Sequence, residues 1–284
     1  MPPNDLSSRA GIVALLQSAG IHPRKQLGQN FLVDSGVLSA LVDEVRRWHP
    51  HTLLEIGAGL GTVTAQLASI ARRVVAVELD ARFIPLLHET TRFQENVEIH
   101  HGDILSFDIG RTFADKSVFI VGNLPYRITA PILKHLIAHR SAISRALLMT
   151  QREVAEKILS SPGPDGSALG VLVRAYTDVS LIRQVPKYAF YPMPNVDSAL
   201  WTLSFLDRPR FSADPTTFFK VVRLLYGKRR KMIRRVLRDL LPPERVVDLL
   251  AAVGIDPTVR GETLGFDLLD RLADEVERIV SSPS

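Results

Sequence analysis

The chain has 284 residues, of which 46% are hydrophobic, so it can bury a substantial core as one large domain or as one domain with an appendage. It contains no cysteine, which excludes disulfides and thiolate metal sites, and no apolar stretch approaches the roughly 18 residues that a membrane span requires. The formal net charge of +5 favours a polyanionic partner.

The first apolar run of the chain, GIVALL, lies close to the start of the sequence. It follows a single arginine, has no small-residue cleavage pattern and soon meets Gln17 and the polar segment HPRK. These features predict an amphipathic helix rather than a signal peptide. We therefore expect a cytoplasmic protein that has no contact with a membrane.

From residue 52 onward, short β-branched runs alternate with longer stretches of helical period. The expected strands are Thr52–Ile56, Val74–Glu78, Val97–His101, Val118–Val121 and Ala146–Thr150, followed later by Asp178–Val185 and Ala199–Phe205. The expected helices are Thr62–Ile70, Ala81–Phe93, Pro131–His139 and Gln151–Leu159, and the Pro/Gly/Ser-rich run SSPGPDGSALG is expected to be an exposed loop. This alternation is typical of an α/β fold with a parallel sheet covered by helices on both faces.

Composition changes after Arg208, where strand patterns give way to helical periodicity. Helices are expected in FFKVVRLLYGKRRKMIRRVLRDLL, in ERVVDLLAAVG and near Leu268–Val280, separated by Pro242-Pro243 and by Gly254–Pro257. We therefore predict two domains, residues 1–207 with the sheet and residues 208–284 as a small all-helical domain.

A glycine-rich turn follows the first expected strand. Gly57, Gly59 and Gly61 have the spacing GxGxG, which differs from the dinucleotide pattern GxGxxG. Glycines let the backbone approach a ligand closely and let a helix begin tightly against the strand, although a tight turn alone needs no ligand. Glu78 ends the second strand, where a carboxylate accepts both hydroxyls of a ribose, and Asp103 ends the third. Together these strand ends predict a nucleoside pocket for either NAD or S-adenosylmethionine.

The fourth strand ends in Gly122-Asn123-Leu124-Pro125-Tyr126, and this stretch distinguishes the two cofactors. The exocyclic amine of adenine is a poor nucleophile, because its lone pair is delocalised into the ring. The carboxamide oxygen of Asn123 and the backbone carbonyl of Leu124 can each accept one N–H and turn the lone pair toward an electrophile, while Tyr126 stacks on the base. Hydride transfer has no use for such a set. The alternative is that Asn123 is a turn former and Tyr126 a core aromatic.

Nine short motifs in chain order together resemble one family, the small-subunit (16S) ribosomal RNA adenine N6-dimethyltransferases. The motifs are GQNFL (Gly28–Leu32), LEIGAGLGTVT (Leu54–Thr64), VELD (Val77–Asp80), GDIL (Gly102–Leu105), GNLPY (Gly122–Tyr126), QREVAEKI (Gln151–Ile158), FYPMPNVDSA (Phe190–Ala199), GKRRK (Gly227–Lys231) and RGETL (Arg260–Leu264). The resemblance covers nearly the whole chain. It implies a Rossmann-like class I methyltransferase sheet whose methyl donor is S-adenosylmethionine and whose acceptors are two adjacent adenosines in a hairpin loop near the 3′ end of the small-subunit rRNA.

The resemblance also implies roles for individual residues. Asn30 and Leu32 close over the cofactor, and Gly57, with Gly59 in the same turn, lies under its methionine portion. Glu78 holds the ribose, Asp103 contacts the cofactor adenine, and Asn123 contacts both ligands. Phe190 stacks on the target base opposite Tyr126, for which the alternative is a core phenylalanine beside a proline turn. Arg127 and Ala130 lie where family members vary, and neither puts activity in doubt.

The run from Lys220 to Arg238 carries nine cations and no acid. We interpret it as one helix that binds rRNA phosphates, with Arg229, Arg230, Lys231 and Arg234 as candidate contacts, because like charges repel unless an anion is near. A solvated helix face is the alternative. The expected partner is small-subunit rRNA in a pre-30S assembly intermediate, and the expected enzyme is a monomer without metal.

Two other functions remain open at this point. A noncatalytic RNA-binding assembly factor would keep the fold, but an intact Asn123, Tyr126 and glycine turn argue against lost catalysis. A large-subunit rRNA adenine methyltransferase is the nearest enzymatic alternative, and only the resemblance of GKRRK and RGETL argues against it.

Overall fold

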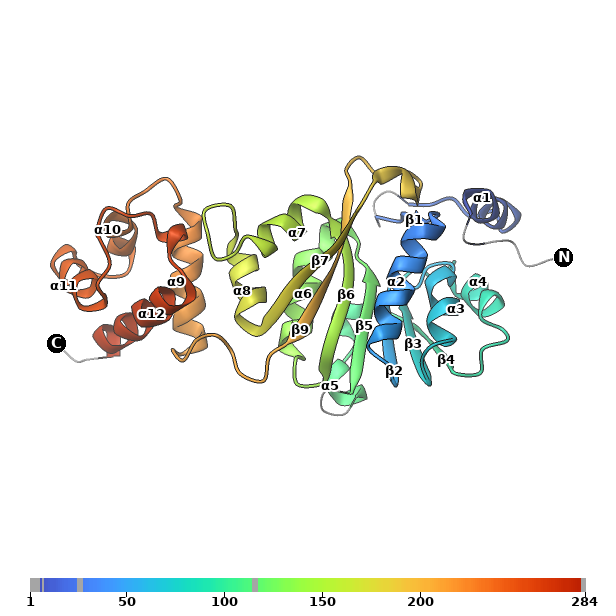
Figure 1. Ribbon diagram of the computed structural model, residues 1–284, viewed down its shortest axis with the longest axis horizontal. Helices are drawn as coiled ribbons and strands as arrows, with labels where there is room; N and C mark the ends of the chain where they lie inside the picture. Colours follow the sequence, from blue (N-terminus) through green and yellow to red (C-terminus); the bar gives the residue numbers. More distant parts are fainter. Residues whose placement is uncertain (1–5, 7, 25–27, 114–116, 282–284) are drawn as a thin grey trace. The chain divides into compact units, whose positions relative to one another are not determined.

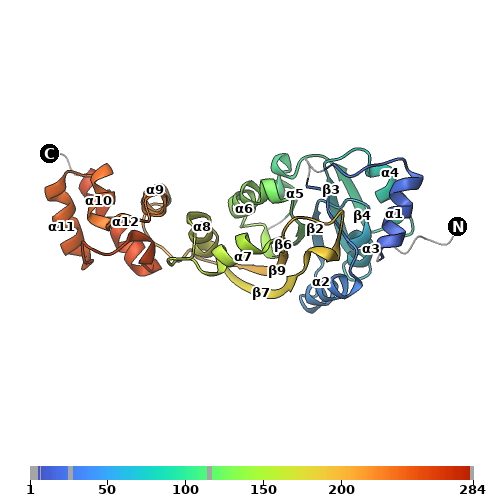
Figure 2. The same cartoon turned by 90° about the horizontal axis from the view of Figure 1, so that it is seen from above.

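The computed structural model describes residues 6, 8–24, 28–113 and 117–281, and the chain divides into two compact units. The first unit comprises Met1–Ala155 and Val179–Phe205, and the second comprises Glu156–Asp178 and Leu206–Ser284. Figures 1 and 2 show the strands in the first unit and helices in the second. Within the described residues no helix is long and apolar enough to cross a membrane.

Within the described residues, the strands of the first unit form a seven-stranded sheet in the order β4-β3-β2-β5-β6-β9-β7, and a separate pair, β1-β8. Their bounds are β1 Phe31–Leu32, β2 Thr52–Ile56, β3 Arg73–Glu78, β4 Val97–His101, β5 Val118–Asn123, β6 Ile143–Gln151, β7 Thr177–Val185, β8 Phe190–Tyr191 and β9 Ser198–Phe205. Strands β4, β3, β2, β5 and β6 run parallel, and β9 pairs antiparallel with β6. Every residue of β2 is buried, as expected for a strand with neighbours on both sides and helices on both faces.

Helices α3, α4, α5 and α6 connect successive parallel strands, and Figure 2 shows α2 and α3 on one face of the sheet and α5 and α6 on the other. Their bounds are α1 Arg9–Ser18, α2 Ser35–Arg47, α3 Thr62–Ala68, α4 Ile84–Thr90, α5 Ile109–Thr112, α6 Thr129–Ala138 and α7 Arg152–Leu159. Short 3₁₀ helices lie at Ile104–Ser106, Tyr126–Ile128 and Lys187–Ala189. Helix α2 begins where Asp34 accepts a hydrogen bond from the Val37 amide, and its apolar stripe packs against Val121, Leu147 and Met149 of the sheet.

The strand predictions from the sequence are confirmed, since each expected strand lies within an observed one. Asn123 is the last residue of β5, as its place after the apolar run predicted. Besides the short 3₁₀ helices, five elements of the described structure were not predicted from the sequence: β1, α2, α5, β8 and α8 (Ala168–Tyr176). Helix α8 begins inside the run that was expected to be an exposed loop, because Ser167 accepts a hydrogen bond from the Gly170 amide and caps its first turn.

The second unit consists of α8, α9 Pro215–Gly227, α10 Ile233–Val236, α11 Pro243–Val253 and α12 Phe266–Ser281, with 3₁₀ helices at Leu237–Asp239 and Gly261–Thr263. Its second segment begins at Leu206, close to the boundary expected at residue 207. The unit also contains Glu156–Asp178, which the sequence placed with the sheet. One reason is the loop before α8, where the Gly163 amide donates to the Tyr226 hydroxyl of α9 at 3.0 Å.

The prediction of one basic helix from Lys220 to Arg238 is wrong. Helix α9 ends at Gly227, a turn follows, and α10 begins only at Ile233. Gly227 has a low helix propensity, and the four residues after it (Lys228–Lys231) are all charged and cannot continue the buried apolar stripe of α9, so the helix stops where its apolar face stops. The cations therefore lie on two helices and the turn between them.

Candidate active site

The ends of the central strands meet at one edge of the sheet because of their register. Ile56 of β2 lies opposite Val77 of β3 and opposite Gly122 of β5. The residues that follow in each strand, Gly57, Glu78 and Asn123, therefore emerge together. They line a cavity of about 230 Å³. Every residue proposed from the sequence to bind the cofactor lines it, namely Asn30, Leu32, Gly57, Gly59, Glu78, Asp103 and Asn123.

The glycine turn adopts backbone angles that other residues rarely take. Gly57, Gly59 and Gly61 have φ values of 75°, 56° and 83°. A Cβ on Gly61 would lie 2.9 Å from the Leu87 side chain, so the start of α3 also packs too closely against α4 for any larger residue. This tight turn brings the Gly59 amide toward the end of β3.

Glu78 is held by that amide. Its Oε2 accepts a hydrogen bond from the Gly59 amide at 2.8 Å, and its Oε1 accepts one from the Asp80 amide at 2.8 Å. Burial raises the pKa of Glu78, and the two amide hydrogen bonds act against that rise. Each carboxylate oxygen has a further lone pair, so this fixed carboxylate can also accept hydrogen bonds from two hydroxyl groups of a ligand in the cavity.

Asn123 is oriented by a contact from the N-terminal part of the chain. Its Nδ2 donates to the backbone carbonyl of Asn30 at 2.9 Å. Since a carbonyl only accepts, this bond fixes which end of the carboxamide is the amine and leaves Oδ1 as the acceptor for a ligand. The following turn is also fixed, because the Leu124 amide donates to the Met149 carbonyl at 2.9 Å and the Leu124 side chain is buried.

The two aromatic residues proposed to stack on a target base occupy different environments. Tyr126 is half-buried, and its hydroxyl lies 2.9 Å from the Ser198 hydroxyl. Phe190 is only 2% exposed and belongs to the core cluster with Leu32. The expectation that Phe190 offers an open stacking face therefore differs from the structure, because pairing of β8 with β1 turns its ring into the core.

Several residues of the cavity wall were missed by the sequence analysis. Leu79 and Ile104 line the cavity directly after Glu78 and Asp103, and Phe31 lines it from β1. Leu79 is 50% exposed, so its side chain is accessible to a ligand. An apolar residue directly after each acidic strand end was the signal available in the sequence. Such a mixture of apolar walls and a few polar groups suits a nucleoside ligand.

Glu55 lies behind the glycine turn and also lines the cavity. It is 4% exposed, and its Oε2 has no hydrogen-bond partner in the part of the chain that the structure describes. Burial raises the pKa of Glu55 to about 8; the nearby Thr64 hydroxyl acts against this rise, and repulsion from Glu78 adds to it. A cationic ligand group bound nearby would favour the ionised form of this carboxyl group and lower its pKa again, so Glu55 can become the counter-charge of such a ligand by losing its proton.

The cavity therefore fits S-adenosylmethionine on each of its chemical parts. Glu78 would hold the ribose hydroxyls, Leu79 and Ile104 would contact the adenine, and the unpartnered Glu55 oxygen would face the cationic methionine portion. Gly57 leaves room for that portion, since a Cβ there would have no atom nearer than 3.9 Å within the described structure.

The raised pKa of Glu55 predicts a specific pH dependence of stability in the ligand-free protein. Between the ordinary pKa of 4.5 and about 8, the folded protein keeps a proton that the unfolded chain has lost. The free energy of unfolding should therefore fall as pH rises through this window, by at most about 5 kcal/mol from this group. Glu55→Gln cannot titrate, so the variant should gain stability relative to the wild type as pH rises. Urea unfolding of both proteins at pH 5, 6.5 and 8 measures the difference, and a difference independent of pH would contradict the assignment.

The chain is similar to known proteins over most of its length. The family described as ribosomal RNA adenine dimethylase matches residues 21–275. A ribosomal RNA small subunit methyltransferase A of Moorella thermoacetica is 39% identical over 90% of this chain and 93% of its own length. The protein of the same name from Anoxybacillus flavithermus is 36% identical over 96% of each chain.

Solved structures give the same picture at the level of the fold. A dimethyladenosine transferase from Plasmodium falciparum superimposes with a TM-score of 0.74 at 22% identity, over 86% of this chain and 96% of that one. The 23S rRNA methyltransferase ErmE superimposes with a TM-score of 0.68 at 25% identity, over 87% of this chain and 100% of that one. The chain belongs to the ribosomal RNA adenine dimethylase family, whose members are S-adenosylmethionine-dependent methyltransferases, as its sequence motifs predicted.

Proposed function

We propose that this protein transfers methyl groups from S-adenosylmethionine to the exocyclic N6 of two adjacent adenosines in a hairpin loop near the 3′ end of small-subunit rRNA, giving N6,N6-dimethyladenosine. The observation that carries the proposal is the Asn123–Asn30 hydrogen bond, which leaves the carboxamide oxygen of Asn123 as an acceptor in the cavity that Glu78 and Asp103 also line. The small-subunit assignment rests on relatives named for that subunit, which are 34–39% identical over most of the chain, against 25% for ErmE.

The chain's own residues orient the acceptor amine. Asn123 Oδ1 accepts one N–H of the adenine amine, and the Leu124 carbonyl accepts the other, so the nitrogen lone pair points into the cavity. Tyr126 stacks on the base, and its hydroxyl is already tied to Ser198. When bound, S-adenosylmethionine supplies a methyl group activated by its sulfonium, so orientation provides most of the acceleration and no strong base is needed. An assembly factor without activity would have no need for this acceptor set.

Mapping of methylated adenosines tests the function and its product. Small-subunit rRNA incubated with the protein and labelled cofactor should carry label at two adjacent adenosines, and large-subunit rRNA should carry none. Leu124 and Pro125 leave space beside Asn123, so an amine with one methyl still fits and dimethyladenosine should dominate at long times. Mass spectrometry of nuclease digests measures the ratio. A reaction that ends at monomethyladenosine, or label on large-subunit rRNA alone, would contradict the proposal.

The second unit is proposed to bind rRNA phosphates, but its cations differ in their availability. Arg229 donates to the Gly166 carbonyl and lies 5.3 Å from the centre of the Tyr226 ring, so it stabilises the loop before α8. Lys228 pairs with Asp239. In contrast Arg230, Lys231 and Arg234 are exposed. These three, rather than Arg229, are the better candidates for phosphate contacts.

Replacing Arg230, Lys231 and Arg234 by alanine should therefore flatten the dependence of log affinity for rRNA on log salt concentration by about two to three units. The affinity for S-adenosylmethionine should remain unchanged, because the first unit holds that site. Filter binding at several salt concentrations measures the slope. Arg46, Arg47 and Arg92 form a matched control, because each is an exposed arginine of the first unit in an ion pair with a nearby acid. An equal slope in the two triple variants would assign the cations of the second unit to a solvated surface.

The proposed setting is the bacterial cytoplasm, where a monomer acts on small-subunit rRNA in a pre-30S intermediate. Relatives named for small-subunit rRNA and the positive net charge support an rRNA partner. Sedimentation of the protein with assembly intermediates and with mature subunits would separate a pre-30S substrate from a finished one.

A further inference from the structure

Asp80 is a buried acceptor just beyond the end of β3, and it is 7% exposed. The guanidinium of Arg82 donates to both of its carboxylate oxygens, from Nε to Oδ1 at 2.9 Å and from Nη2 to Oδ2 at 2.6 Å. Gln29 Nε2 donates to the same Oδ2 at 2.8 Å. These hydrogen bonds lower the pKa of Asp80, with Arg82 as the main cause, so the carboxylate remains charged at neutral pH. The buried Asp80 carboxylate thus accepts hydrogen bonds from two side chains, one of which, Gln29, lies far from it in the sequence.

The same side chains bind the backbone of the N-terminal segment, meaning the described residues 21–24 and 28–32. Gln29 Oε1 accepts a hydrogen bond from the Arg24 amide at 2.7 Å. Arg82 Nη1 donates to the His22 carbonyl at 3.1 Å. The Asp80 carboxylate is therefore connected to this segment through Gln29 and through Arg82.

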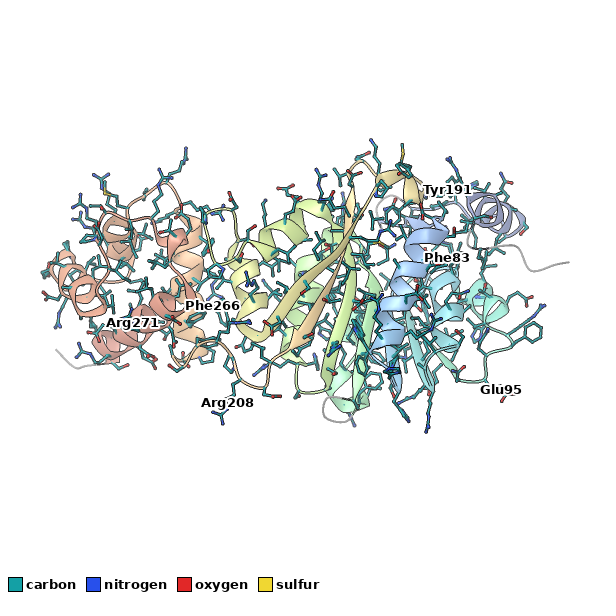
Figure 3. All side chains as sticks on the ribbon, viewed as in Figure 1. Phe83, Glu95, Tyr191, Arg208, Phe266 and Arg271 are labelled. Atoms are coloured by element: carbon teal, nitrogen blue, oxygen red, sulfur yellow. The ribbon has the colours of Figure 1, made fainter. Side chains whose placement is uncertain are left out.

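This segment forms one wall of the cavity. Its residues Gly28, Gln29, Asn30, Phe31 and Leu32 all line it. The Phe31 ring packs edge-on against Phe83 at 5.4 Å, and Figure 3 shows Phe83 near α1. The backbone amide of Asp80 also donates to Glu78 Oε1. The network thus connects Glu78, the proposed ribose acceptor, to the wall of the cavity that the N-terminal segment forms.

We propose that Gln29, Asp80 and Arg82 form a clasp that holds the N-terminal segment against the cavity and sets how long S-adenosylmethionine remains bound. The proposal rests on the function above only for the identity of the ligand. The hydrogen bonds of the clasp oppose the movement of this wall that release of the ligand requires, and they also spare the cost of ordering the segment on binding, so the clasp slows release and lowers the dissociation constant.

Replacement of Arg82 tests whether the clasp positions the N-terminal segment, without removing a residue that lines the cavity. Gln29 and Asp80 line the cavity, but Arg82 is not among the described residues that do. Any effect of Arg82 on cofactor affinity must therefore act through Asp80 and the N-terminal segment. The matched control is Arg73, the first residue of β3, which donates from Nε and Nη2 to both oxygens of Glu98 at 2.7 and 2.9 Å. Within the described structure neither Arg73 nor Glu98 lines the cavity. Arg82→Gln and Arg73→Gln remove the same charge and the same kind of two-pronged contact.

Titration calorimetry and stopped-flow dissociation with S-adenosylmethionine provide the test. Arg82→Gln should raise the dissociation constant roughly tenfold through faster release, while Arg73→Gln should stay within about twofold of the wild type. Arg82→Lys keeps the ion pair with Asp80 but not all three contacts, so it should give a rise of about threefold. Unchanged release in Arg82→Gln would overturn the clasp. Failure of the wild type itself to bind S-adenosylmethionine would instead overturn the proposed function.

Hydrogen exchange on the ligand-free protein gives an independent readout. Amides of residues 28–33 should exchange faster in Arg82→Gln than in Arg73→Gln, and amides of β2 should not differ. Gln29→Ala leaves the Arg82–Asp80 pair in place and removes only the direct link, so it should accelerate exchange at the same amides, even if Arg82→Gln folds poorly. Unchanged exchange of residues 28–33 in Gln29→Ala would refute the proposal.

Discussion

Asn123→Ala is expected to lose methyl transfer by a factor of at least about 10²–10³, while S-adenosylmethionine binding survives with at most a moderate weakening. The reason is that different residues of the cavity are proposed to bind the cofactor and to orient the adenine amine. Glu78, Asp103 and the glycine turn provide most of the proposed cofactor contacts, whereas Asn123 provides the acceptor that turns the adenine amine. Single-turnover transfer to rRNA and calorimetry with the cofactor measure the two effects separately.

Asn96→Ala is a suitable control for this variant. Asn96 is also part-buried, and its Nδ2 donates to the carbonyls of Ala68 and Ala71 at 2.9 Å, away from the cavity. Its loss should lower the unfolding temperature but leave the transfer rate unchanged. If Asn123→Ala dimethylates rRNA at nearly the wild-type rate, the proposed role of the carboxamide is wrong.

Glu78→Gln is expected to weaken S-adenosylmethionine binding about a hundredfold, which corresponds to ~2.7 kcal/mol. Both oxygens of Glu78 accept backbone amides, from Gly59 and from Asp80. A glutamine must place an NH₂ group against one of these N–H donors, so the side chain turns away or the glycine turn shifts. The variant also loses the charge that binds two hydroxyls most strongly.

The control for this second variant is Glu98→Gln on the neighbouring strand β4. Glu98 is an exposed carboxylate paired with Arg73, and it does not line the cavity within the described structure. Its replacement should leave the dissociation constant for the cofactor unchanged. If the dissociation constant of Glu78→Gln stays within threefold of the wild type, Glu78 does not hold the ribose.

The sequence alone was sufficient for the sheet and for one side of the site. Strands buried on both faces must be continuous apolar runs, and the residue at the carboxyl end of such a run must emerge at the edge of the sheet. Glu78 and Asn123 end their strands in the structure, whereas Gly57 lies one residue beyond β2 and Asp103 two residues beyond β4. The sequence alone nevertheless assigned all four to one cavity, and all four line it. The motifs also predicted the family, which the comparisons confirm.

Properties that depend on contacts between distant residues could not be predicted in this way. The environment of Phe190 depends on the pairing of β8 with β1, two strands of two residues each, which are too short to leave a periodic pattern. The break after Gly227 and the inclusion of Glu156–Asp178 in the second unit depend on which apolar faces find partners.

The distinction has a single physical cause. The local pattern of apolar and polar residues determines which segments are buried strands and where each strand ends, so the sequence by itself determined the strands, the glycine turn and the polar strand ends. Hydrogen bonds between residues far apart in the chain depend on distances that only the folded protein sets. Tertiary structure alone therefore decided that Asn30 orients Asn123 and that Gln29 and Arg82 both donate to Asp80. It also decided that Glu55 is buried with one oxygen that has no hydrogen-bond partner among the described residues.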